Sequence, residues 1–198
     1  MIDKQQVADA LRRGGVVLLP TDTVYGLAAR PDNEEAINKL FALKARPRTV
    51  NLPVMVADPS DLEPLGLELN DAARRLLRSP LIPGAVTLVL GFGAGRRAAW
   101  LEGRDEIATR IPDDDFLRSV LRLTGALLVT SANRHGNPCT PERVADILQQ
   151  LNGMPDLVVE RGAGKEVPST IVNCRPSPPV VERVGLIDPA IIKKIMES

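Results

Sequence analysis

Small polar side chains stand where an apolar run of this sequence ends, and they could contact a bound substrate. The segment 20–27, Pro-Thr-Asp-Thr-Val-Tyr-Gly-Leu, directly follows the apolar run 16–19. A buried strand that ends in such residues presents them at a sheet edge, where open α/β sheets bind ligands. The segment therefore predicts a pocket wall. A plain turn in which Thr21 and Asp22 bond to nearby backbone is the alternative.

Two later segments repeat this arrangement of hydroxyl groups beside a predicted strand. The segment 130–136, Thr-Ser-Ala-Asn-Arg-His-Gly, follows the apolar run 126–129, and the segment 168–172 contains Ser169 and Thr170. Hydroxyls, a carboxamide and backbone amides suit phosphate or carboxylate oxygens. Each segment could also be an ordinary loop, so it is their recurrence that indicates a binding site.

Cationic side chains are available to bind the same anions. Lys44 and Arg46 precede Pro47, and Arg110 and Arg183 stand at the ends of predicted strands. Arginine suits planar, bidentate recognition of carboxylate or phosphate groups. A lone Lys-x-Arg at a helix end is otherwise a solvated pair that complements the helix dipole. The segment 83–87, Pro-Gly-Ala-Val-Thr, is by itself mostly structural, because proline and glycine set a tight turn before a strand.

The composition limits what this site could do. With 198 residues, 44% of them hydrophobic, the chain can bury one substantial core, and we expect a single domain over 1–198. Lysine plus arginine and aspartate plus glutamate number 25 each, so no overall field attracts nucleic acid or membrane. Aromatic residues make up only 3%, too few for a surface that reads unpaired bases by stacking.

The cysteines and the N-terminal segment indicate an intracellular protein. Cys139 and Cys174 lack metal-ligand spacing and are expected to be buried free thiols. The segment 1–6 has no apolar signal core, and no apolar run approaches the length that spans a membrane. A cytoplasmic location is therefore expected.

Strands and helices alternate along the chain, without internal repeats. Late strands that are not each followed by a helix predict a mixed sheet, hence an open twisted α/β fold with flanking helices. The expected strands are 16–19, 52–57, 87–90, 107–111, 126–130, 157–159, 170–172 and 180–184. The expected helices are one between Asp3 and Gly14, one opened by 32–35 and closed by Pro47, 70–78, 116–123, one that begins at Thr140-Pro141, and one capped by Asp188-Pro189.

The order of the motifs resembles the YrdC-like family of threonylcarbamoyl-AMP synthases over about residues 5–185. The matching segments are 20–27, Lys-x-Arg-Pro at 44–47, Pro-Gly-x-x-Thr at 83–87, Arg-x-Pro at 110–112, Ser-x-Asn at 131–133 and Ser-Thr-Ile-Val at 169–172. The resemblance implies an α/β fold with an open twisted mixed sheet and a large concave basic cavity. It also implies a reaction in which L-threonine, bicarbonate and ATP give threonylcarbamoyl-AMP and pyrophosphate. The product then serves threonylcarbamoyl-adenosine modification of tRNA.

The resemblance also implies roles for individual residues. The threonine amine captures carbon dioxide as a carbamate, whose oxygen attacks the α-phosphate; cations and hydrogen-bond donors stabilise the crowded negative charge without a covalent nucleophile. Mg²⁺ is expected to arrive with ATP, with no metal ligand on the protein. The catalytic residues implied are Lys44, Arg46, Ser131 and Asn133; these four bind ATP together with Thr140 and Arg183, and threonine is held by Thr23, Arg110, Thr130 and Ser169, with Arg110 on its carboxylate.

Three positions depart from the pattern of many relatives. Met55 stands where a histidine would help to hold threonine, and Ala85 replaces the second proline of Pro-Gly-Pro. His135, the single histidine, occupies the place of a common serine after Ser-x-Asn. Two interpretations of His135 remain open: an exposed loop residue near the pocket, or a titrating contact that compensates for Met55.

Two other functions remain as alternatives to the synthase. A carbamoyl-adenylate-forming enzyme of the carbamoyltransferase type has a similar domain, but those proteins are generally longer. A non-catalytic paralogue that binds double-stranded RNA or tRNA would show binding that weakens steeply with salt. Neutral net charge makes weak RNA binding a secondary property at most. We also expect the product to pass to the tRNA threonylcarbamoyl-transfer machinery, and we expect no association with membranes.

Overall fold

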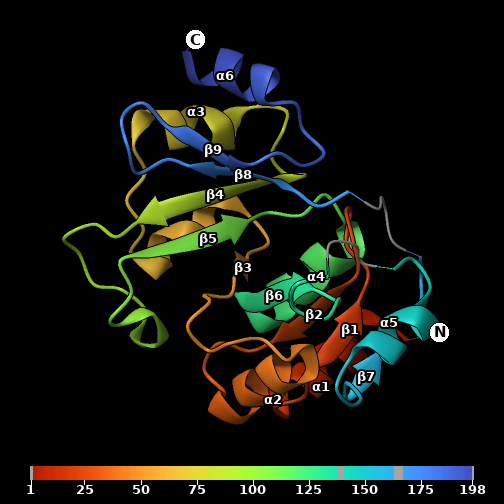
Figure 1. Ribbon diagram of the computed structural model, residues 1–198. Coiled ribbons are helices and arrows are strands. Elements are labelled where there is room, and N and C mark those ends of the chain that lie inside the picture. Colours follow the sequence, from red (N-terminus) through yellow and green to blue (C-terminus); the bar gives the residue numbers. More distant parts are fainter. Residues whose placement is uncertain (1, 138–140, 163–166, 198) are drawn as a thin grey trace.

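The computed structural model describes residues 2–137, 141–162 and 167–197, and in these the strands form one mixed sheet (Figure 1). The sheet has nine strands in the order β7-β1-β2-β6-β3-β5-β4-β8-β9. The pairs β1–β7, β3–β5 and β4–β8 are parallel, and the other neighbours are antiparallel. The strands are β1 (Val17–Leu19), β2 (Gly26–Ala29), β3 (Val54–Met55), β4 (Val86–Gly91), β5 (Glu106–Arg110), β6 (Leu127–Ser131), β7 (Leu157–Val158), β8 (Thr170–Asn173) and β9 (Val180–Arg183).

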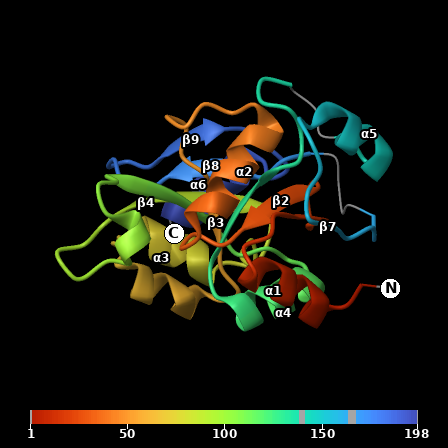
Figure 2. The same ribbon diagram turned by 90° about the horizontal axis from the view of Figure 1, so that it is seen from below.

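Helices cover both faces of this sheet. The helices α1 and α4 lie side by side under the half that contains β1 and β2, whereas α3 and α6 pack together at the β4–β8–β9 half (Figures 1 and 2). The helices are α1 (Lys4–Arg12), α2 (Glu34–Lys44), α3 (Asp71–Arg78), α4 (Asp115–Thr124), α5 (Val144–Gln150) and α6 (Pro189–Glu197), with short 3₁₀ helices η1 (Pro59–Leu65) and η2 (Ala99–Leu101).

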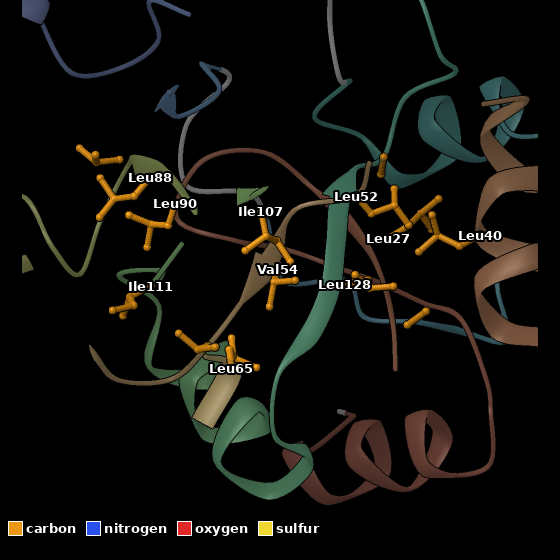
Figure 3. Packing of buried hydrophobic residues seen from close by; sticks show 14 of the residues in the cluster. Leu27, Leu40, Leu52, Val54, Leu65, Leu88, Leu90, Ile107, Ile111 and Leu128 are labelled. Atoms are coloured by element: carbon orange, nitrogen blue, oxygen red, sulfur yellow. The ribbon is translucent and has the colours of Figure 1, made fainter. Parts of the chain in front are cut away.

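Alternation along the strands divides the apolar side chains between two clusters. Val16 and Leu18 belong to a large cluster with α2, α3, α5 and α6, while Val17 and Leu19 face a smaller one with α1 and α4. Successive side chains of a strand point to opposite faces, so β1, β2, β3 and β6 each contribute to both clusters. In the large cluster, Leu27 lies beside Leu40 of α2, and Val54 lies near Leu128 (Figure 3).

Most of the expected elements are confirmed, and the first helix shows why. Asp3 accepts a hydrogen bond from the Gln6 backbone N–H, and the Gln6 side chain accepts from the Asp3 N–H, which completes a capping box. Strand β2 is not among the expected elements, because its Gly-Leu-Ala-Ala composition lacks the β-branched residues typical of strands. The short helices η1 and η2 were not expected either.

Two expected boundaries are wrong. The strand expected at 52–57 is reduced to Val54–Met55, since Pro53 has no N–H to donate to a ladder. The helix expected from Thr140-Pro141 begins at Val144, because its first turn is built on the Arg143 carbonyl, which accepts from Asp146 N and Ile147 N. Thr140 lies outside the described residues.

The structure tests the expectation of buried free thiols at one of the two cysteines, and it tests for membrane-spanning helices in the described residues. Cys174 is a buried free thiol, and burial raises its pKa to about 11. Cys139 lies outside the described residues. None of the helices in the described part of the chain is long and apolar enough to cross a membrane.

Candidate active site

The end of α2 places a lysine amine inside the protein. The helix begins at the cap residue Asn33, whose side chain accepts from Ala36 N, and it ends at Ala45, which takes the left-handed conformation with φ 48°. Its last residue, Lys44, is only 1% exposed. The helix therefore delivers Lys44 to the end of β6 and leaves Arg46 just beyond, in the following loop.

Oxygen atoms of the Ser-x-Asn turn surround the Lys44 amine. Lys44 Nζ donates to the carbonyl oxygen of Ser131 and, at 2.7 Å, to that of Asn133, and it lies 3.4 Å from Asn133 Oδ1. An ammonium group has three donors, so these acceptors use all of them. Lys44 can act on a bound anion through its charge rather than through a hydrogen bond of its own.

The turn itself is held by a short network. Ser131 Oγ donates to Asn133 Oδ1 at 2.5 Å, and Asn133 Nδ2 donates to the carbonyl of Asn137 at 2.6 Å. The His135 side chain is exposed, but its backbone N–H donates to the Lys44 carbonyl at 2.9 Å. We call Lys44, Arg46, Ser131 and Asn133 the Lys44 cluster.

The electrostatics of this cluster set Lys44 apart. Burial, together with the nearby charge of Arg46, lowers the pKa of Lys44 to about 7. Arg46 is half-buried, donates to the carbonyls of Val50 and Asn51, and has its pKa lowered by burial. At neutral pH the Lys44 amine is thus poised between its charged and neutral forms, and negative charge on a ligand would favour the charged form.

A second group of predicted residues gathers at the end of β5. Arg110 NH1 donates to Thr23 Oγ1 and NH2 donates to Asp22 Oδ1, both at 2.7 Å, while Nε donates to the Gly84 carbonyl at 3.0 Å. The Arg110 and Asp22 side chains are only 5% and 11% exposed. This is a buried, hydrogen-bonded ion pair.

Hydroxyl groups and a second arginine adjoin Arg110. Thr87 is the register partner of Arg110, and its Oγ1 lies 2.7 Å from Ser169 Oγ. Arg183 donates to the Ser169 carbonyl from Nε and NH2, at 3.2 and 2.8 Å. Ser169 and Thr87 link Arg183 to the strand position opposite Arg110. Partial burial and the charge of Arg110 lower the pKa of Arg183. We call Asp22, Thr23, Arg110, Ser169 and Arg183 the Arg110 cluster.

The turn before β2 joins the two clusters. Thr23 accepts the hydrogen bond from Arg110, and two residues later the Tyr25 carbonyl accepts from Ala132 N at 2.7 Å. Thr21 behaves as in a plain turn, since its Oγ1 donates to the Val24 carbonyl and accepts from Thr23 N. Both interpretations of this segment therefore apply, to different residues: Thr21 shapes the turn, while Asp22 and Thr23 bind Arg110.

The predicted site residues thus fall into two groups rather than one network. Thr130 is buried one position before Ser131, opposite Leu27 in the sheet. Thr140 lies outside the described residues. Sequence reasoning did not assign Asp22 or Thr87 to the site, although Asp22 stands in the first motif and the pairing of β4 with β5 places Thr87 opposite Arg110.

A cavity of about 500 Å³ borders the Arg110 cluster. It is lined by Thr21, Asp22, Pro80, Leu81, Pro83, Gly84, Ala85, Asp113, Asp114, Gly162, Leu186 and Ile187. Burial raises the pKa of Asp114. The resemblance implies a basic cavity, but this lining, within the described part of the chain, contains three aspartates and no lysine or arginine.

Comparison with known proteins assigns the chain to a family. A model of the Sua5/YciO/YrdC family, described as "Telomere recombination", matches residues 9–185. The chain belongs to this family, which confirms the resemblance seen in its motifs.

Individual relatives make the assignment more specific. A threonylcarbamoyl-AMP synthase of Bacillus subtilis is 33% identical over 194 residues, which are 96% of this chain and 56% of that protein. Proteins of the same name from Stutzerimonas stutzeri and Idiomarina loihiensis are 37% and 34% identical; the alignments cover 71% and 87% of this chain and 75% and 94% of theirs. The chain thus spans little more than half of one relative and nearly all of another.

Solved structures confirm the fold. P. abyssi Sua5 complexed with L-threonine superposes with a TM-score of 0.86 at 28% identity, covering 98% of this chain and 58% of that one. E. coli YciO gives a TM-score of 0.81 at 27% identity, with coverage of 93% and 90%. A HypF structure in a phosphate- and nucleotide-bound form, at 18% identity and a TM-score of 0.72, shares the fold alone.

Proposed function

We propose that this protein is a threonylcarbamoyl-AMP synthase, which forms threonylcarbamoyl-AMP and pyrophosphate from L-threonine, bicarbonate and ATP. The observation that carries the proposal is the pair of cationic clusters joined by the turn 20–25. One suits an amino-acid carboxylate and the other suits phosphates, and the reaction must bring these two groups together. Relatives that bear this name support the same function.

The Arg110 cluster is suited to the carboxylate of threonine. Arg110 uses one N–H on each of its three nitrogens for protein acceptors, so one N–H remains on each terminal nitrogen. Two parallel N–H donors are what a bidentate carboxylate requires. The Thr23 hydroxyl contacts the guanidinium group, and the hydrogen-bonded hydroxyls of Thr87 and Ser169 lie on the neighbouring strands, so all three can bind the remaining polar atoms of the amino acid.

The Lys44 cluster is suited to the nucleotide phosphates. In the proposed step a carbamate oxygen forms a bond to the α-phosphorus, and the bond from that phosphorus to the pyrophosphate oxygen breaks. The Lys44 charge and the Arg46 guanidinium stabilise the negative charge that moves onto the leaving group. Mg²⁺ enters with ATP as part of the substrate.

The test is pyrophosphate release from ATP with Mg²⁺ and bicarbonate, measured with each of the amino acids in turn. Dependence on threonine supports the proposal. The scan over amino acids is needed because the buried Met55 stands where the resemblance implies a histidine that helps to hold threonine. Dependence on carbamoyl phosphate would instead indicate the carbamoyltransferase class. Salt-sensitive RNA binding without turnover would indicate the non-catalytic class.

The proposal extends to the biological setting. A threonylcarbamoyl-adenylate is a reactive mixed anhydride, so a downstream enzyme must accept it and transfer the threonylcarbamoyl group to tRNA. Such a pathway needs ATP and tRNA together, and we infer a cytoplasmic location, where both are present.

A further inference from the structure

The Asp22 carboxylate has no role in the function proposed above, yet it forms a deeply buried ion pair with Arg110. Its Oδ1 accepts from Arg110 NH2 at 2.7 Å, and its side chain is 11% exposed. Asp22 also lines the cavity of about 500 Å³ beside the cluster. It therefore lies between the cavity and the guanidinium group that we assign to the substrate carboxylate.

The charges around Arg110 are unequal. Burial lowers the pKa of Arg110, and the Asp22 carboxylate opposes that effect. Arg183 lies nearby and donates only to Ser169 in the described part of the chain, where it forms no ion pair. Of the two guanidinium groups, only that of Arg110 is paired with a carboxylate in the described part of the chain. The charge of Arg183 is therefore available to a ligand carboxylate while Asp22 stays on Arg110.

The geometry of Arg110 is set by three acceptors on three different nitrogens. The Gly84 carbonyl binds Nε, the Thr23 hydroxyl binds NH1, and Asp22 binds NH2. Three such contacts determine both the plane of the guanidinium group and its rotation within that plane. Of the three acceptors only Asp22 carries a charge, and charge-assisted hydrogen bonds are the stronger ones.

We propose that Asp22 is the positioning residue of the amino-acid subsite. It holds the Arg110 guanidinium so that its two remaining N–H groups receive the substrate carboxylate, and it stays bound to Arg110 when the substrate enters. The inference rests on the proposed function for the identity of that substrate. It differs from a gate, in which Asp22 would occupy the substrate position and leave when threonine binds.

The kinetic test compares Asp22→Asn with Asp115→Asn. Asp115 is an exposed residue at the start of α4, next to Asp114 in the cavity lining, and its replacement removes the same charge without touching Arg110. We expect Asp22→Asn to raise the threonine KM about 10- to 100-fold, the effect of a lost charged hydrogen bond. The ATP KM should stay within about twofold, and Asp115→Asn should match the wild type in both constants.

A second measurement does not depend on turnover. Asp22→Ala leaves space for a small carboxylate beside Arg110, so formate should raise its melting temperature and restore part of its threonine affinity. In Asp22→Asn that space is filled, and formate should have little effect. These results separate a positioning carboxylate from a generally destabilising change.

The outcomes distinguish this inference from the proposed function. A threonine KM in Asp22→Asn that equals or falls below that of Asp115→Asn would overturn the positioning role, and a lower KM would indicate the gate. If the wild type releases no pyrophosphate with threonine, the proposed function fails. The formate response of Asp22→Ala then still decides the role of Asp22, and equal responses in Asp22→Ala and Asp22→Asn would refute it.

Discussion

Lys44 and Arg110 are both buried cations at the end of a regular element, but the protein compensates their charges in different ways. Lys44 is surrounded by neutral oxygens of the Ser131–Asn133 turn, and its pKa falls to about 7. Arg110 has a carboxylate, Asp22, at 2.7 Å. Neutral oxygens solvate a cation only in part, so Lys44 can lose its proton near neutral pH, whereas a guanidinium group remains charged.

The difference matches what the two proposed substrates need. An amino-acid carboxylate is present throughout the proposed reaction and requires a permanent, oriented partner. Phosphates that leave as pyrophosphate carry a charge that changes during the reaction, and a lysine near its pKa can respond to that change. Five measurements test this comparison.

The largest effect is expected for Lys44→Met, with Lys39→Met as the matched control. Lys39 also lies on α2, but it is partly exposed and pairs with Asp156. Loss of the buried charge should lower kcat/KM for pyrophosphate release at least about a hundredfold, as for other preorganised electrostatic groups. We expect the same for Arg46→Ala with the fold intact by circular dichroism. Near-normal turnover in both Lys44→Met and Arg46→Ala would remove the Lys44 cluster from the reaction.

Gly185→Ala should disrupt the Arg110 cluster by displacing the backbone of Ser169. A Cβ atom at this position would lie 2.3 Å from the Pro168 carbonyl oxygen and 2.5 Å from Ser169 C, where the chain crosses itself. We expect a loss of about 2–4 kcal/mol in the free energy of unfolding, together with a raised threonine KM. Gly95→Ala has no atom within 4 Å of the new Cβ, so its unfolding curve should match the wild type. Equal stability of the two variants would show that the backbone at Gly185 and Ser169 can shift to accommodate the added Cβ atom.

The pH dependence should differ between the two substrates. With a pKa of about 7, Lys44 loses most of its charge between pH 7 and 8, so the ATP KM should rise about fivefold in that interval. The threonine KM should not follow the titration of Lys44, since Arg110 does not titrate there, and it should change with pH only through the threonine amine, which must be neutral to capture carbon dioxide. Steady-state kinetics across pH 6–9 test this, and an ATP KM that changes equally in Lys44→Met would mean that another group is responsible.

The free energy of unfolding should rise with pH over the range in which ATP binding weakens. The unfolded chain keeps the Lys44 proton up to the ordinary pKa of 10.5, whereas the folded chain releases it near 7. The unfolded state therefore binds more protons within this window, and the Lys44 contribution to the free energy of unfolding rises with pH between about 7 and 10.5. Urea unfolding of wild type and Lys44→Met at several pH values measures the difference.

The smallest effect is expected for His135→Ser. The imidazole is exposed, and only the backbone N–H of this residue contacts Lys44. The ATP and threonine KM should therefore change by less than about twofold, which favours the interpretation of His135 as an exposed loop residue. A larger change in either constant would favour the titrating contact.

Much of the fold could be predicted from the sequence, together with the residue types of the candidate site. The motifs at 44–47, 110–112 and 131–133 contain the cations and the turn that the structure gathers into the two clusters, while their roles in a reaction stay a prediction. Capping residues such as Asp3 and Asn33 are local signals, and the helices that they begin were predicted well. Strand β2 was not predicted because its residues are small and lack the usual strand propensity. The tertiary packing requires the small residue at Gly26, where a Cβ would lie 2.8 Å from Val129 Cγ1.

The grouping of the site residues could not be predicted in the same way. Thr87 meets Ser169 and Arg110 only because β4 pairs with both β5 and β8, and these contacts join residues far apart in the chain. Asp22 illustrates the point most clearly. Its position after a strand was visible, but its partner lies 88 residues further along.

By itself, the sequence determined which chemical groups are present, which elements form locally, and to which family the chain belongs. The tertiary structure decided which groups touch, and with that their charge state. Lys44 has an ordinary side chain whose pKa is lowered only by burial and by Arg46, and Asp22 becomes a counter-ion only where the sheet brings Arg110 to it. Local propensities arise from neighbours in sequence, whereas desolvation and ion pairing depend on distances that only the folded chain sets.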